Sequence, residues 1–224
     1  EFTILVATSG DTGSEVANGF YGVYGIRVVI LYPKGRVSPI QEKQMTTLGG
    51  NISALEIDGS FDDCQRLVKE AFLDEDLTKR FRLTSANSIN IARLIPQMFY
   101  HVLARARSTC AHPLVMSVPS GNFGNLTAGL MAKRMGMFVD RFIAATNRND
   151  VVPAYLEHGI FTPRPSVQTI SNAMDVGNPS NFVRMQWLFE NTVERMRKEI
   201  TGARVSEEET RQTMQEVFDQ HHYI

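Results

Sequence analysis

The sequence predicts an α/β fold with two mainly parallel sheets flanked by helices. Short, nearly continuous apolar runs alternate with segments whose apolar residues recur at helical spacing. Strands that are apolar on both faces are typical of parallel sheets that helices cover on both sides. Strands are expected over 3–8, 27–32, 52–57, 114–118 and 141–146.

Helices are expected between and after these strands. Ser60 and Ser206 each precede an acidic residue by three positions, which is the spacing of a capping box. Pro96 predicts a kink or a place in a first turn, and Gly136 predicts a helix stop. The apolar spacing predicts helices over 14–20, 64–72, 91–103, 126–135 and 185–200, and one more after Ser206.

Two breaks in this pattern suggest how the chain is organised. The charged segment 74–82 follows the third strand, so we expect part of a smaller α/β domain over 1–82 and part of a larger, cofactor-binding one over 83–224. Residues 162–182 contain three prolines and one glycine and read as a long loop. Loops of that length inside compact domains are often functional.

Composition excludes several classes of function. The 224 residues have a net charge of −1, so neither a nucleic-acid partner nor a membrane-surface role is expected. No apolar run reaches the roughly 20 residues that span a bilayer, and no signal peptide is visible. Cys64 and Cys110 cannot form a disulfide framework, and they fit buried thiols in a reduced, cytoplasmic compartment.

A turn of small residues, ATSGDTG at 7–13, links the first strand to the first helix. Backbone N–H groups at a helix N-terminus attract carboxylates and phosphates, and Ser9 and Thr12 add hydroxyl donors. A helix N-cap without a ligand explains the same pattern equally well.

A second loop, SVPSGNFGN at 117–125, also lies between a strand and a helix. Gly121 and Gly124 allow the backbone to approach a ligand closely, and Asn122 and Asn125 tolerate turn conformations. The loop predicts a phosphate cradle. A plain βα turn is the less favoured alternative, because two such loops occur in one small chain.

A third polar segment, 84–93, opens a long apolar helix. Arg93 could bind a phosphate or carboxylate with its forked guanidinium. Helix capping by Asn87 or Ser88 is equally compatible with the pattern.

Several familiar motifs are absent from the sequence. There is no G-x-G-x-x-G fingerprint, no Walker A loop and no G-x-S-x-G elbow. The five histidines are scattered except for one adjacent pair, so surface or capping roles are expected and metal binding is not; they are His101, His112, His158, His221 and His222.

Six strings in order resemble the threonine synthase family, over essentially the whole chain. They are ATSGDTG, LYPKGRVSPIQEKQM, NSINIARLIPQ, VPSGNFGN, FIAATNRND and SNAMDVGNPSNF. The resemblance implies the fold-type-II architecture of pyridoxal phosphate (PLP) enzymes, which is similar to that of the tryptophan synthase beta chain. It also implies conversion of O-phospho-L-homoserine and water to L-threonine and phosphate, the last step of threonine biosynthesis.

The resemblance carries site residues over by motif. The loop residues Gly121, Asn122, Phe123, Gly124 and Asn125 would hold the PLP phosphate, and Ser9 would lie at the cofactor. The substrate would be surrounded by Thr8, Gly10, Asp11 and Thr12, and lined by Asn87, Asn90 and Arg93. No metal is implied, and the expected assembly is a monomer or a homodimer.

One departure from the family is serious. The family's Schiff-base lysine lies upstream of the SGDTG turn in a Phe-Lys-Asp-Phe-like string, and that string is absent here. The resemblance therefore implies a central fragment that lacks both ends, contains no catalytic residue, binds PLP weakly and turns nothing over. Two alternatives stay open: a phospho-lyase that releases a keto acid, and a non-catalytic remnant that acts as a binding module.

Overall fold

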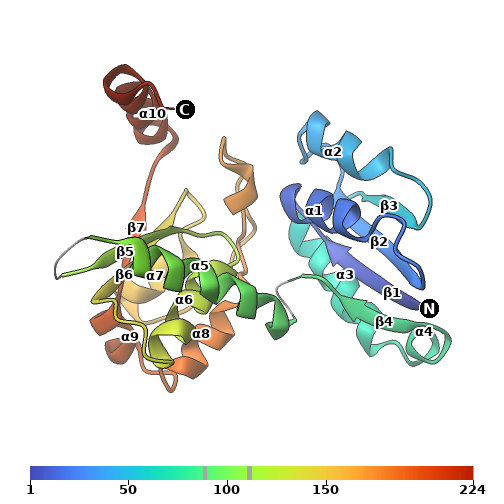
Figure 1. The fold of residues 1–224 in the computed structure, drawn as a ribbon, viewed down its shortest axis with the longest axis horizontal. Helices are drawn as coiled ribbons and strands as arrows, with labels where there is room; N and C mark the ends of the chain where they lie inside the picture. Colours follow the sequence, from blue (N-terminus) through green and yellow to red (C-terminus); the bar gives the residue numbers. More distant parts are fainter. Residues whose placement is uncertain (88–89, 110–112, 224) are drawn as a thin grey trace. The chain divides into compact units, whose positions relative to one another are not determined.

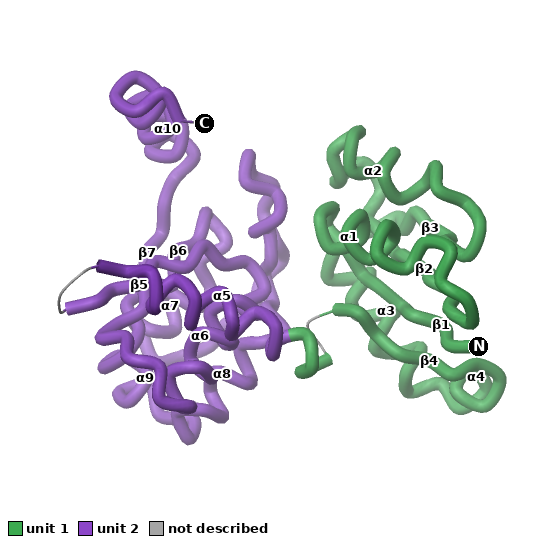
Figure 2. The backbone as a smooth tube through the Cα atoms, in the orientation of Figure 1, with its two compact units in different colours: residues 1–93 green, residues 94–224 purple. Residues whose placement is uncertain are grey.

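The computed structural model describes residues 1–87, 90–109 and 113–223. The chain divides into two compact units, Glu1–Arg93 and Leu94–Ile224 (Figure 2). The expected boundary at 82/83 falls inside the strand Arg82–Ser85, which belongs to the sheet of the first unit, and the observed division lies further along the chain. None of the described helices is long and apolar enough to cross a membrane.

The first unit contains a fully parallel sheet in the order β3-β2-β1-β4 (Figure 1). Its strands are β1 Phe2–Ala7, β2 Ile26–Pro33, β3 Ile52–Ile57 and β4 Arg82–Ser85. Its helices are α1 Asp11–Phe20, α2 Pro39–Thr46, α3 Phe61–Leu73 and α4 Glu75–Arg80, and a 3-10 turn follows at Ile91–Arg93.

Side-chain alternation along these strands builds two cores. Ile4 and Val6 of β1 point to the face that Val16 of α1 and Met45 of α2 cover. Ala7 belongs to the opposite face, where α3 packs. Because successive side chains of a strand point to opposite faces, helices cover this sheet on both sides.

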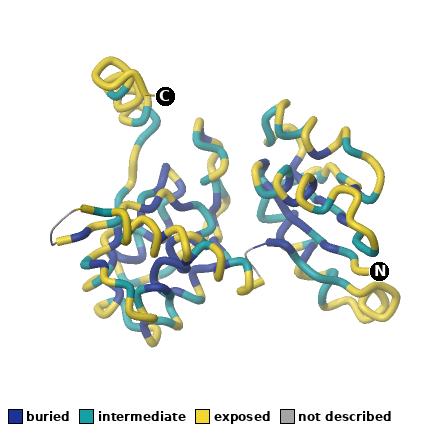
Figure 3. The backbone as a smooth tube through the Cα atoms, viewed as in Figure 1, coloured by how far each residue is buried: buried dark blue, intermediate teal, exposed yellow. Residues whose placement is uncertain are grey.

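The second unit contains a parallel sheet in the order β5-β6-β7. Its strands are β5 Val115–Pro119, β6 Arg141–Thr146 and β7 Ile200–Arg204. Its helices are α5 Leu94–Arg107, α6 Gly124–Arg134, α7 Val151–His158, α8 Phe182–Leu188, α9 Val193–Glu199 and α10 Glu207–His221, with a 3-10 turn at Asn172–Met174. Phe142 of β6 and Phe182 of α8 are among the largest side chains of its core. By contrast, α10 buries none of its residues (Figure 3).

All five expected strands are confirmed within two residues at either end. Strands β4 and β7 were not expected, because neither is a continuous apolar run. The expected helix over 185–200 is wrong: Glu190 and Asn191 adopt φ of 54° and 55°, which ends α8 before α9 begins. The last residue of that range, Ile200, starts β7.

The expected helix ends are confirmed where local chemistry sets them. Ser60 and Asp63 form both bonds of a capping box, as do Ser206 and Glu209. Pro96 lies in the first turn of α5, where its missing N–H leaves no broken bond. Residues between α7 and α8 form the expected long loop, apart from one 3-10 turn.

Cys64 of α3 is fully buried against Ala7 and Val68. Burial raises the pKa of this thiol to about 12, and the negative charge of Asp63 adds to the shift. Cys110, the other expected buried thiol, lies outside the described residues.

We expect Cys64 to be almost inert while the protein is folded. In a Cys110→Ser background, alkylation by iodoacetamide at about pH 8 should be on the order of a thousand-fold slower for the folded than for the unfolded chain, because thiolate is scarce and covered. Equal rates for the two states would contradict the burial of Cys64.

The same shift predicts how stability depends on pH. The unfolded thiol ionises from about pH 8.5, whereas the folded one does so at about 12. The contribution of Cys64 is therefore complete below about pH 8.5 and is lost as pH rises toward 12. A Cys64→Ala variant in the same background should lack this part of the pH dependence in urea unfolding.

Candidate functional site

In the first unit, the turn after β1 is held together from within. The hydroxyl of Thr8 is buried and accepts hydrogen bonds from the backbone amides of Gly10 and Gly13, both at 2.9 Å. Gly10 has a φ of 143°, and a Cβ at this position would overlap the side chain of Gln41. The turn thus needs glycine at this position, and Thr8 supports the turn from inside.

Asp11 opens α1 and links the turn to α2. Its carboxylate accepts a hydrogen bond from the Gln41 side-chain amide. Gln41 also closes the capping box of α2 with Ser38. Ser9 and Thr12 are half-buried in the same turn.

Asn87 joins this turn to the end of β4. Its side-chain oxygen accepts from the Ala7 amide at 2.7 Å, and its side-chain nitrogen donates to the Ala7 carbonyl at 2.6 Å. Asn87 therefore closes the carboxyl end of β1. Ser88, the alternative capping residue, lies outside the described residues.

Asn90 and Arg93 also make contacts within the first unit. The Asn90 side chain donates to the Ser85 carbonyl at 3.3 Å and accepts from the Ala92 amide at 3.1 Å. The Arg93 guanidinium donates to the Ala86 carbonyl. The structure thus places Thr8, Ser9, Gly10, Asp11 and Thr12 together with Asn87, Asn90 and Arg93 beyond the carboxyl ends of β1 and β4, where open α/β sheets bind ligands.

In the second unit, the loop after β5 leads into α6. Phe123 occupies the N-cap position of α6 and has left-handed backbone angles, with φ 60° and ψ 16°. The residue is buried, with 2% of its surface exposed. No side chain among the described residues caps α6. The first-turn amides, which begin at Gly124, have no acceptor within the helix. They fit the phosphate of the expected cofactor, since an uncapped helix N-terminus binds anions.

The residues around 174–181 hold this loop from one side. The side-chain oxygen of Asn122 accepts from the amide and hydroxyl of Ser180, at 2.6 and 3.0 Å. The buried Asn181 donates to the Asn122 carbonyl at 3.0 Å. A Cβ on Gly121 would lie 2.7 Å from the Cα of Met174, so the two backbones touch at a position that only glycine permits.

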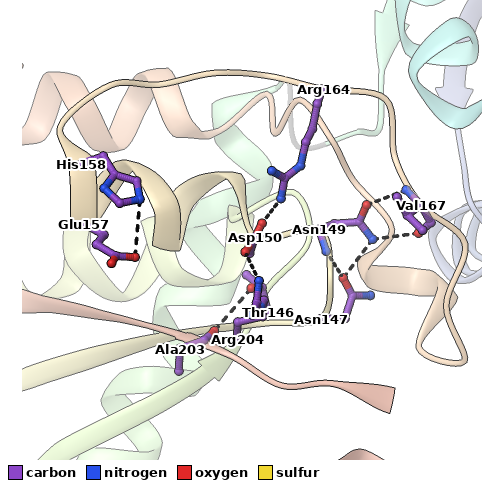
Figure 4. A network of polar contacts seen from close by, with 10 residues as sticks. All are labelled: Thr146, Asn147, Asn149, Asp150, Glu157, His158, Arg164, Val167, Ala203 and Arg204. Carbon is purple, nitrogen blue, oxygen red and sulfur yellow. Dashed lines mark hydrogen bonds and ion pairs between the residues drawn. The ribbon is translucent and has the colours of Figure 1, made fainter. Parts of the chain in front are cut away.

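A buried polar network anchors the same segment to the end of β6. The Asn147 side chain donates to Asp175 and to Thr169, each at 2.8 Å. Asn149 exchanges two hydrogen bonds with the backbone of Val167, at 2.7 and 2.9 Å (Figure 4). Burial raises the pKa of Asp175, and hydrogen bonds from Thr169 and Asn147 offset part of that shift.

The structure adds residues to which the sequence analysis gave no role at a binding site. They are His101, Asn147, Asn149, Asp175, Ser180 and Asn181. The strings NRND and NAMDVGNPSN are rich in asparagine. This richness was the one feature of the sequence that could have pointed to most of these residues. His101 is buried and contacts Asn125, so it has no surface role. Among the described residues, no group of three or more His, Cys, Asp or Glu could hold a metal ion.

We expect Asn87→Ala to lower the free energy of unfolding by about 2 kcal/mol, because it leaves the buried amide and carbonyl of Ala7 without partners. Asn18→Ala is the matched control, since Asn18 is exposed on α1 and makes one bond to the Ser14 carbonyl. Urea unfolding measures both variants. Equal losses for the two would contradict the role given to Asn87.

The chain is similar to known proteins along most of its length. Threonine synthase from Serratia marcescens is 54% identical over 219 residues, which cover 97% of this chain and 51% of that protein. Threonine synthase from Escherichia coli (strain K12) is 54% identical over 217 residues, which cover 96% of this chain and 50% of that protein. The chain thus spans about half the length of these relatives.

Solved structures give the same picture. The crystal structure of threonine synthase from Escherichia coli matches with a TM-score of 0.92 at 50% identity, covering 97% of this chain and 51% of that one. PLP-bound threonine synthase from Brucella melitensis matches with a TM-score of 0.87 at 35% identity, covering 100% of this chain and 54% of that one. A family model described as pyridoxal-phosphate dependent enzyme matches residues 1–224. The chain therefore belongs to the pyridoxal-phosphate dependent enzymes and has the expected fold-type-II architecture of two parallel sheets flanked by helices.

Proposed function

We propose that this chain forms part of a threonine synthase, a PLP-dependent lyase that converts O-phospho-L-homoserine and water to L-threonine and phosphate. The observation that carries the proposal is the loop 120–125, which presents an uncapped helix N-terminus to an anion. The similarity to threonine synthases along nearly the whole chain supports the choice of reaction.

In this proposal the loop residues Gly121 to Asn125 hold the cofactor's phosphate. The α6 dipole and first-turn amides stabilise the phosphate charge without a counter-ion from a side chain. Bound PLP would supply an electron sink for negative charge that develops on the substrate. The described contacts of Asn122 and Gly121 keep the loop in the shape that this binding needs.

The turn 8–12 binds the substrate carboxylate in the same proposal. The amides of Gly10 and Gly13 are already bonded to Thr8, so the donors that this proposal uses are the amides of Asp11 and Thr12 and the hydroxyls of Ser9 and Thr12. The reaction breaks the bond between the γ carbon and the phosphate oxygen, and water supplies the hydroxyl of the β carbon. The role of this chain is to orient the substrate and to stabilise charge.

The proton-transferring lysine does not come from this chain in our proposal. None of the six lysines lies in the family's motif. Lys133 pairs with Glu199 at 3.2 Å near the carboxyl end of α6, and Lys79 pairs with Glu75 at 2.8 Å on α4. We therefore propose that the 224 residues alone do not turn over substrate. The cytoplasmic location and the monomeric or homodimeric state stay predictions.

The first test measures phosphate release from O-phospho-L-homoserine by the protein expressed from its complete reading frame, with the amino-acid product identified in the same tube. We expect phosphate and threonine in equal amounts, and no phosphate from the 224 residues alone. Phosphate with a keto acid would replace the synthase by a phospho-lyase. No phosphate and no PLP absorbance would favour the binding module.

The second test separates anion binding from stability at one position. Gly124→Asp places a negative charge at the first residue of α6, where it interacts favourably with the helix dipole but repels a bound phosphate. We expect the free energy of unfolding to stay equal or rise by about 0.5 kcal/mol, while the Kd for PLP rises at least about ten-fold. Gly124→Asn is the neutral control of the same size. Equal PLP affinity in the two variants would contradict the cradle.

A further inference from the structure

His101 is a buried titratable residue that the proposed function leaves without a role. It lies on α5 and is 7% exposed. Its Nε2 is 3.0 Å from the backbone carbonyl oxygen of Asn125 and 2.7 Å from that residue's side-chain oxygen. Its ring meets Phe142 edge to face, with the centroids 6.0 Å apart.

The imidazole of His101 fits between α5 and α6 where α6 carries a glycine, Gly129. A Cβ on Gly129 would lie 2.9 Å from Cε1 of His101 and 2.9 Å from Cε1 of Phe142. Real Cβ atoms do not approach ring atoms so closely, so the absence of a side chain at 129 admits the imidazole. Leu94 and Met98 of α5 pack against Ala128 and Ala132 of α6 and fix the distance between the helices.

The chemistry of the contact determines the form of the imidazole. Both Asn125 atoms near Nε2 are oxygens, which accept hydrogen bonds. Nε2 must therefore carry a hydrogen and donate it. One donor thus binds the main chain and the side chain of a residue in the first turn of α6, next to the amides that face the loop.

We propose that His101 is a positioning residue for the cofactor's phosphate: through Asn125 it sets the orientation of the first turn of α6. This inference rests on the proposed function, because it assumes that the loop 120–125 holds PLP. His101 itself touches neither cofactor nor substrate in this proposal. Its donor keeps the first turn in one arrangement, so less order has to be gained when the phosphate binds.

Three variants of the protein expressed from its complete reading frame test the proposal. His101→Gln keeps an N–H donor at the end of a side chain of similar length, and His101→Leu keeps the volume but removes the donor. Gly129→Ala keeps the histidine in the sequence, but the added Cβ displaces the imidazole ring. Two matched controls are His158→Leu on the exposed end of α7 and Gly19→Ala, where a Cβ would meet nothing within 4 Å.

The readouts are the Kd for PLP, the 31P resonance of the bound phosphate, and the thermal midpoint of unfolding. We expect His101→Leu and Gly129→Ala to raise the Kd about ten-fold and to shift the 31P resonance. We expect His101→Gln and both controls to match the wild type. A Kd and a 31P resonance unchanged in His101→Leu would overturn the inference. So would an equal effect of Gln and Leu, because the donor would then not matter.

A further measurement does not depend on PLP. Nitrogen-15 correlation spectra of the imidazoles should show His101 with a hydrogen on Nε2, and a neutral ring protonated on Nδ1 alone would overturn the inference. If the wild type binds no PLP, the proposed function fails and this inference fails with it. If the wild type binds PLP and His101→Leu binds equally well, only the inference fails.

Discussion

The structure depends on one constraint: the backbone groups where the parallel strands end are buried and must be hydrogen-bonded. An asparagine side chain meets this need in the first unit, where Asn87 binds both polar groups of Ala7 at the end of β1. In the second unit an asparagine that follows β6, Asn149, binds both polar groups of Val167 in the long loop after α7. An asparagine amide both donates and accepts, so one side chain satisfies two backbone groups and ties a distant segment to the strand end.

Side chains cap some helix N-termini and leave others open. Serine side chains cap α2, α3 and α10 in complete capping boxes. Among the described residues, no side chain caps α7, α8 or α9. The same holds for α1 and α6, which follow the two glycine-containing turns. A cap contributes about 1 kcal/mol to stability, so these two helices leave that stabilisation unused. The same two turns contain most of the residues that the family resemblance assigned to cofactor and substrate.

Rigid surroundings keep the second of these turns in an unfavourable shape. Phe123 has a positive φ, which costs a non-glycine residue roughly 1–2 kcal/mol. Its side chain belongs to the core of the second unit, so burial offsets this cost. Three separate segments contact this region. The loop is contacted by Ser180, Asn181 and Met174, and the first turn of α6 is contacted by His101. The shape of the loop is therefore set by tertiary contacts, although its glycines make the shape possible.

The sequence alone determined the fold class, the five expected strands, the capping boxes of Ser60 and Ser206, and the two turns at strand ends. Each of these depends on residues close together in the chain, through apolar periodicity, caps or glycine conformations. Only the tertiary structure decided that Arg82–Ser85 and Ile200–Arg204 are strands, because pairing with β1 and β6 creates them. It also decided the contacts of Asn87, Asp175 and His101 with residues far away in the sequence. Local patterns contain no information about which distant backbone group a buried amide or imidazole will meet, and packing alone supplies it.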